Sequence, residues 1–299
     1  MRIDWTGVFP ALTTEFHEDG SLDLDATRRH ARLCIEAGCT GIVVLGTLGE
    51  NTSLRPDEKE RVAAAVVEAA DGRVPVLAGV AEYTTEFAVE AAARAARAGC
   101  DGLMVLPGMV YPQDEREAVT HFATVARASR LPIMIYNNPV AYHVDLGPEA
   151  LAALAEHRNI VAVKDSSHDS RRITDMVNRL GDRYLLFCGV DDLLLENVLC
   201  GAVGWISGLA NGFPVEAVRL FDLAHGRRLN EALALYRWLM PLLHLDTDRK
   251  LVQMIKLVNQ LTGTGREWVR APRLPLVGEE RRRVEDLVRH ALATRPSTV

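Results

Sequence analysis

Hydrophobic residues along this chain fall into short, nearly continuous runs that are bounded by glycine or proline. Such runs lack the alternation of a half-exposed strand and are typical of parallel strands that are covered on both faces. We interpret eight of them as strands: residues 7–13, 41–46, 74–80, 102–106, 132–137, 160–165, 184–190 and 203–209.

The segments between these runs carry apolar residues at helical spacing. Residues 84–98 and 114–129 also have acidic residues early and arginine late, as the helix dipole favours. An Ala-Gly-Cys-x-Gly sequence precedes two of the predicted strands, at residues 37–41 and 98–102, which indicates one strand–helix module used repeatedly. Eight such modules predict a (β/α)8 barrel, whose reactive groups lie at the carboxyl ends of the strands.

The chain continues beyond these eight modules. We assign residues 1–227 to the barrel and residues 228–299 to a C-terminal extension with three further helices, at residues 231–244, 249–261 and 279–293. The predicted fold class is therefore α/β: a (β/α)8 TIM barrel with a C-terminal helical extension.

Composition narrows the class of function. The 299 residues are 48% hydrophobic and 25% charged, as in ordinary globular proteins. The net charge of -6 gives no basic surface for nucleic acid, and no apolar stretch approaches the ~18 residues of a membrane span. Five cysteines without a C-x-x-C spacing predict reduced thiols and a cytoplasmic protein. Nine histidines form no metal-binding motif, so we expect no metal.

Lysine is scarce, since the 34 basic residues include only Lys59, Lys164, Lys250 and Lys256. Lys164 follows an apolar run at the end of a predicted strand, where burial lowers the pKa of an amine and favours the neutral nucleophile that forms a Schiff base. An ion pair with Asp165 at the rim explains this lysine equally well. The scarcity of lysine favours the nucleophile, because arginine can form an ion pair but not an imine.

Two other features lie at strand ends. Tyr136 ends the strand before that of Lys164, so its phenol is a candidate for general acid–base work there; a lone tyrosine would otherwise be an ordinary half-buried aromatic. The glycine-rich turn that begins at Gly46 offers backbone N–H groups to an anion such as a carboxylate. A tight turn without a ligand has the same sequence.

Four motifs in the expected order resemble those of the dihydrodipicolinate synthase and N-acetylneuraminate lyase family of Schiff-base (class I) aldolases. The resemblance covers essentially the whole chain and is carried by residues 46–50 (GTLGE), 136–139 (YNNP), 164–165 (KD) and 189–192 (GVDD).

This resemblance implies a role for individual residues. Lys164 would form the imine and Tyr136 would relay protons. Thr47 and the backbone of Leu48, in the turn that begins at Gly46, would hold the carboxylate of a 2-oxo acid. Gly189 and Ile206 would line the site, and Asn138 is a further substrate-binding candidate. No cofactor is needed beyond the covalent imine, and the usual assembly of the family is a homotetramer built as a dimer of dimers.

The chain also departs from the synthases of this family. They carry a second threonine where this chain has Leu48, paired tyrosines where it has Gly108 and Met109, and an arginine shortly after the YNNP motif, where this chain has residues 140–143. These departures remove a hydroxyl relay and a guanidinium, so we do not expect dihydrodipicolinate synthase activity.

The motifs look most like the hydroxyproline-catabolic branch, which deaminates 1-pyrroline-4-hydroxy-2-carboxylate to 2-oxoglutarate semialdehyde. A 2-keto-3-deoxy sugar-acid aldolase or dehydratase is the alternative, with polar groups for the substrate hydroxyls at Tyr111, Asn138, Tyr142, His143, Ser167 and His168. A non-catalytic sensor of keto acids is a weaker alternative, because both Lys164 and Tyr136 are present.

Overall fold

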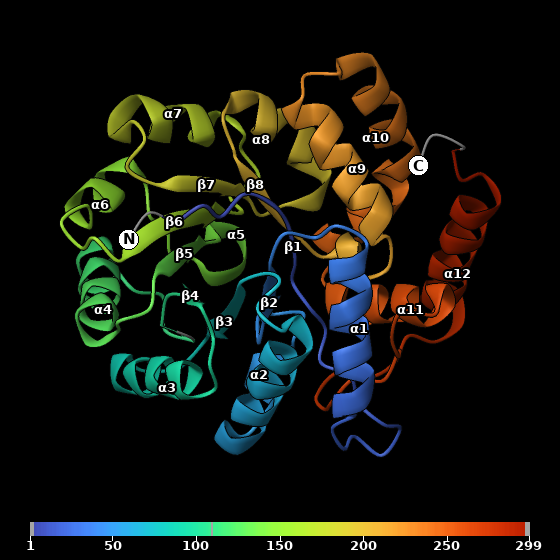
Figure 1. The fold of residues 1–299 in the computed structure, drawn as a ribbon, viewed down its shortest axis with the longest axis horizontal. Coiled ribbons are helices and arrows are strands. Elements are labelled where there is room, and N and C mark those ends of the chain that lie inside the picture. The colour runs from blue at the N-terminus through green and yellow to red at the C-terminus, as the bar shows by residue number, and fades with distance from the viewer. Residues whose placement is uncertain (1–2, 109, 297–299) are drawn as a thin grey trace.

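The computed structural model describes residues 3–108 and 110–296, and parallel strands form its centre (Figure 1). The strands are hydrogen-bonded in the order β1-β8-β7-β6-β5-β4-β3-β2, and a parallel bridge between Ala11 and Val43 brings the two ends of this sheet together. The predicted (β/α)8 barrel is therefore confirmed. The strands are β1 (Gly7–Pro10), β2 (Ile42–Val44), β3 (Val76–Val80), β4 (Gly102–Val105), β5 (Ile133–Asn137), β6 (Ile160–Asp165), β7 (Leu185–Cys188) and β8 (Gly204–Ser207).

Each predicted run contains one strand. Five of the runs extend past the carboxyl end of their strand, because their last residues already belong to the connections there. The barrel interior is packed with large side chains, as this fold requires. Phe9, Phe187 and Trp205 are fully buried, and the rings of Phe9 and Phe187 meet edge to face with centroids 5.4 Å apart.

Helices surround the strands, and the last three form a group at one side of the barrel (Figure 1, orange and red). All three helices predicted for the extension are present, as α10, α11 and α12. The helices are α1 (Leu24–Glu36), α2 (Pro56–Ala70), α3 (Thr85–Arg97), α4 (Glu115–Ala128), α5 (Pro139–Tyr142), α6 (Pro148–Ala153), α7 (Arg171–Leu180), α8 (Leu194–Cys200), α9 (Pro214–His225), α10 (Leu229–Leu243), α11 (Leu251–Thr262) and α12 (Gly278–Ala293).

Buried polar contacts attach the extension to the carboxyl ends of β1 and β2. Lys256 of α11 and Glu50, which follows β2, are both fully buried, with Nζ 3.0 Å from Oε1. The Lys256 ammonium also donates to the backbone carbonyl of Thr14, at 2.8 Å, and the backbone N–H of Arg270 donates to the other oxygen of Glu50, at 3.0 Å. Because a buried charge is tolerated only when it is paired, these contacts fix the extension against the barrel.

Within the described ranges, none of the helices combines the length and the apolar character that crossing a membrane requires. The five cysteines are all free, and four of them are buried.

Candidate active site

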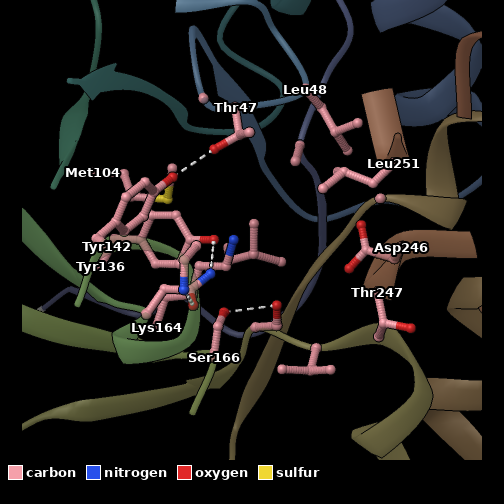
Figure 2. A pocket seen from close by; sticks show the side chains of 18 of the residues that line it. Thr47, Leu48, Met104, Tyr136, Tyr142, Lys164, Ser166, Asp246, Thr247 and Leu251 are labelled. Carbon is pink, nitrogen blue, oxygen red and sulfur yellow. Dashed lines mark hydrogen bonds between the residues drawn. The ribbon is translucent and has the colours of Figure 1, made fainter. Parts of the chain in front are cut away.

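A cavity of about 100 Å³ opens among the carboxyl ends of the strands. All eight residues predicted for the site line it: Gly46, Thr47, Leu48, Tyr136, Asn138, Lys164, Gly189 and Ile206. Figure 2 shows Lys164, Tyr136 and Tyr142 on one wall and Asp246, Thr247 and Leu251 on the facing wall.

Lys164 lies near the end of β6, directly opposite Tyr136 in the register of β5 and β6. Its side chain is buried, and Nζ lies over the Tyr136 ring, 3.8 Å from the centroid. Burial is the main cause that lowers the pKa of this amine, against the nearby Asp246 carboxylate, which raises it. The alternative of an ion pair with Asp165 is not realised, because Asp165 instead lies 3.4 Å from Arg172.

Gly189, at the end of β7, makes room for this lysine. A Cβ at this position would lie 2.8 Å from the Lys164 Cε and 2.2 Å from the Ser166 hydroxyl oxygen. No ordinary side chain fits so close to these atoms, so Gly189 lines the cavity by leaving space.

The other three lysines have carboxylate partners. Lys59 lies 2.7 Å from Glu82, Lys250 contacts Glu280 at 2.5 Å, and Lys256 pairs with Glu50. Among the described residues, Lys164 alone of the four has no carboxylate within 4.0 Å of Nζ. The missing partner therefore distinguishes Lys164 from the other three lysines, whereas scarcity alone does not.

Tyr136 belongs to a group of hydroxyls on the same wall. Its oxygen accepts a hydrogen bond from the side-chain amide of Asn138, at 3.1 Å, and burial raises the pKa of the phenol, which keeps it protonated at neutral pH. Tyr142, at the end of the short helix α5, packs edge to face on Tyr136 and shares a 2.9 Å hydrogen bond with the Thr47 hydroxyl. Thr47 and Tyr142 are thus hydrogen-bonded beside Tyr136, although Leu48 stands where the synthases have a second threonine.

The turn after β2 is tightly constrained. Leu45 has a positive φ of 59°, and a Cβ at Gly79 of β3 would lie 2.2 Å from its carbonyl oxygen. The Asn51 side chain donates to that same carbonyl, at 2.9 Å. The backbone N–H groups of Thr47 and Leu48 donate to none of the described residues and so are free to bind an anion in the cavity.

Sequence reasoning missed Asp246, Thr247 and Leu251, which reach the cavity from the extension. Asp246 is partly buried, and burial raises the pKa of its carboxyl to about 6, although Lys164 opposes this increase. The only sequence signal is an acidic residue between two apolar helices, and this does not show that the segment reaches the barrel.

Several polar residues near the strand ends do not face the cavity. Of the six side chains considered for sugar hydroxyls, three line the cavity: Asn138, Tyr142 and His168. The other three, Tyr111, His143 and Ser167, are not among the described lining residues, and Tyr111 is exposed and donates a hydrogen bond to Glu117. Met109 lies outside the described residues. In the described part of the chain, His, Cys, Asp and Glu side chains nowhere form a group of three or more that could hold a metal ion.

The chain is similar to known proteins over nearly its whole length. The model of the dihydrodipicolinate synthetase family matches residues 4–291. The 4-hydroxy-tetrahydrodipicolinate synthase of Methanothrix thermoacetophila is 32% identical over 283 residues, which cover 94% of this chain and 95% of the relative. An uncharacterized DapA-like lyase of Halobacterium salinarum is 40% identical over 216 residues, 72% of this chain and 71% of that one.

Solved structures of the same family are also similar to this chain. Dihydrodipicolinate synthase from Aquifex aeolicus superimposes with a TM-score of 0.91 at 30% identity, over 96% of this chain and 98% of that one. A prophage protein of Escherichia coli K12 from the same family, solved in complex with pyruvate, has a TM-score of 0.91 at 27% identity, over 96% and 99% of the chains. The names of the relatives argue against our expectation that synthase activity is absent.

Proposed function

This chain belongs to the dihydrodipicolinate synthetase family, whose members are lyases of the class I aldolase type, and from that premise we propose that it deaminates 1-pyrroline-4-hydroxy-2-carboxylate. The product would be 2-oxoglutarate semialdehyde. Lys164 would form the imine, Tyr136 would move protons, and the free N–H groups of Thr47 and Leu48 would bind the substrate carboxylate. The pyruvate complex of the E. coli relative supports a 2-oxo acid or its imine as the ligand class.

The reaction begins with ring opening. The substrate enters as the protonated cyclic imine. A bond forms between the neutral Lys164 amine and C2, and a proton moves from Nζ to the ring nitrogen. The bond from C2 to that nitrogen then breaks, so the nitrogen stays on C5 as an amine and the new imine on Lys164 is protonated. Tyr136 is the group that carries this proton. The protonated imine on Lys164 then acidifies C3, so that the C3 proton and the C4 hydroxyl leave as water.

Hydrolysis completes the balance. Proton transfer from C5 to C3 moves the double bond to C4 and C5 and produces an enamine. A proton that moves from the nitrogen to C4 then converts this enamine to an imine at C5. One water then releases ammonia from C5, and the water lost from C3 and C4 is regained at C2 when the product leaves Lys164. The net reaction consumes one water and gives one ammonia.

The charged residues of the cavity are the main observation that supports the hydroxypyrroline as the substrate. Among the described lining residues there is no arginine, and the charged side chains are Lys164 and Asp246, with His168 as a titratable neighbour. Such a site suits a substrate with one carboxylate and a distal amine. A second substrate carboxylate would lack a cation, because Lys164 has to be neutral to attack.

The proposal is tested by ammonia release and by trapping. Purified protein should release ammonia from the hydroxypyrroline, and borohydride should add substrate mass to the peptide that contains Lys164. Lys164→Arg keeps the charge but cannot form an imine, so we expect neither ammonia nor adduct. An adduct that persists in Lys164→Arg would refute the assignment of the nucleophile.

4-Hydroxy-tetrahydrodipicolinate synthase activity is the second candidate, favoured by the names of the relatives. It would join pyruvate, held as an imine on Lys164, to aspartate semialdehyde without releasing ammonia. Consumption of both of these compounds, with no ammonia from the hydroxypyrroline, would favour it. A 2-keto-3-deoxy sugar-acid lyase, supported by Asn138, Tyr142 and His168 in the cavity, would instead release pyruvate or another 2-oxo acid from sugar acids.

The assembly and the location are predictions that accompany this proposal. We expect a homotetramer in the cytoplasm, without a nucleic-acid or membrane partner and without a cofactor. Light scattering coupled to size-exclusion chromatography measures the oligomeric state directly.

A further inference from the structure

We propose that Asp246 forms a second subsite in the cavity, which binds a protonated amine at the end of the substrate opposite its carboxylate. The inference rests on the proposed function, because opening the pyrroline ring at Lys164 is the step that frees such an amine.

The position of Asp246 is the first argument. It lies in the short 3-10 helix η4 (His244–Thr247) between α10 and α11. Figure 2 shows its carboxylate across the cavity from Lys164. A Cβ at Gly208 would lie 2.3 Å from Oδ1 of Asp246, so glycine after β8 provides the space into which this carboxylate extends. The carboxylate therefore belongs to the cavity wall and not to the outer surface.

The surroundings of Asp246 provide the second argument. Among the described residues, no lysine, arginine or histidine lies within ion-pair distance of it. Four charged or titratable groups interact electrostatically with its carboxylate. They are Lys164 of β6, Tyr136 of β5, and Asp191 and Asp192 of the short 3-10 helix η2 (Asp191–Leu193).

The two neighbouring carboxylates already have partners. Asp191 accepts hydrogen bonds from the backbone of Gly208, at 3.1 Å, and from the indole of Trp205, at 2.9 Å. Asp192 lies 2.8 Å from the His244 ring. Within the described ranges, Asp191 also has no cation beside it, but its neutral donors satisfy its oxygens. Among the described residues, the Asp246 carboxylate receives only a backbone contact from Asp191. It is thus the carboxylate that faces the cavity with neither a counter-charge nor a set of donors.

In the proposed reaction, the counter-charge for Asp246 would come from an ammonium group on the substrate. Lys164 has to be neutral when it attacks C2, so it does not compensate Asp246 at that stage. An unpaired carboxylate in a half-buried site is unfavourable, and an ammonium group on the substrate would relieve this cost through a charge-assisted hydrogen bond. Leu48 and Leu251 line the cavity near Asp246 and can contact the carbon chain between the two ends of the substrate (Figure 2).

The test compares ligands that do and do not carry the amine. 1-Pyrroline-2-carboxylate yields an amine on C5 when Lys164 opens its ring, and 2-oxopentanoate has the same five carbons without nitrogen. Each is titrated as a competitor of pyruvate in cyanoborohydride trapping, and the adducts on Lys164 are quantified by mass spectrometry. The variants are Asp246→Asn, which keeps the shape, and Asp248→Asn as a matched control whose carboxylate lies 3.2 Å from the exposed Arg283.

We expect Asp246→Asn to weaken competition by the pyrroline by about tenfold or more, because hydrogen bonds to charged groups are among the strongest. Because Asp246 also raises the pKa of Lys164, each competition is expressed relative to pyruvate trapping by the same variant. Competition by 2-oxopentanoate should then change by less than about twofold, and Asp248→Asn should leave the results for all three ligands unchanged. An equal loss for all three ligands would overturn the inference, because Asp246 would then act on the imine at Lys164. Unchanged competition by the pyrroline would overturn it as well.

Failure of the proposed function is distinguishable from failure of this inference. Trapping requires only imine formation, so a wild-type protein that releases no ammonia from the hydroxypyrroline still reports on Asp246 through the pyrroline and 2-oxopentanoate. If the wild type forms no adduct with any ligand, both the inference and the proposed chemistry are wrong.

Discussion

Replacement of Asp246 by asparagine should stabilise the unliganded protein above neutral pH. Burial raises the pKa of this carboxyl from an ordinary 3.8 to about 6. A difference of about 2 in pKa corresponds to about 3 kcal/mol, at roughly 1.4 kcal/mol per pKa unit. Because the carboxylate still meets water in the cavity, we expect a gain of about 1 to 3 kcal/mol at pH 8.

The direction of the pH dependence follows from the two protonation states. Below pH 3.8, where the carboxyl is protonated in both the folded and the unfolded chain, its ionisation costs nothing. As the pH rises toward 6, the unfolded chain loses the proton first, so the free energy of unfolding decreases, and above pH 6 the full cost is present. Asparagine cannot ionise, so the advantage of the variant should shrink by about two thirds between pH 7 and pH 4.5.

Thermal unfolding of wild type, Asp246→Asn and Asp248→Asn across this pH range measures the effect. The control loses only a partly exposed ion pair, so its stability should stay within about 0.5 kcal/mol of wild type. A variant at position 246 that is no more stable than wild type at pH 8, or whose advantage does not depend on pH, would refute the argument from burial.

Two further predictions concern proton transfer and the attachment of the extension. Tyr136→Phe removes the phenol that Asn138 contacts and should lower kcat by on the order of a hundredfold or more, with little change in KM; a loss confined to KM would contradict a proton relay. Lys256→Met removes the ammonium from the buried Glu50 and leaves it the Arg273 guanidinium, 3.7 Å away, as its remaining cation. It should lower the free energy of unfolding by about 3 kcal/mol, the lower end of the range for breaking a buried ion pair, measured by urea denaturation. A loss below about 1 kcal/mol would mean that the remaining contacts satisfy Glu50.

The barrel can be predicted from the sequence because each strand is marked by a pattern within its own few residues. Each buried parallel strand appears as one apolar run, and the order of eight runs fixes which strand ends meet. The approach of Tyr136 to Lys164 follows from that order, since β5 and β6 are adjacent and the two residues are paired in register. Motif order and strand order thus supply most of the wall on which the imine forms.

The facing wall could not be predicted because it depends on contacts between distant segments. Asp246 lies in a turn between two helices, and only the packing of the extension brings it to the cavity. The contribution of Tyr142 depends on the short helix α5, whose four residues give no periodic signal. The rarity of lysine was also a weak guide, because Lys256 is used for a buried ion pair.

The packing of the C-terminal helices against the barrel has a consequence for how substrate specificity could change in evolution. The proposed nucleophile and proton carrier lie on strands of the repeated strand–helix module. One wall of the cavity instead comes from the segment at residues 244–247, which lies outside these modules. Exchanging that segment could redirect which molecules are accepted and leave the nucleophile untouched. A protein trimmed to its first 227 residues would lose this part of its discrimination together with the ammonium that neutralises Glu50.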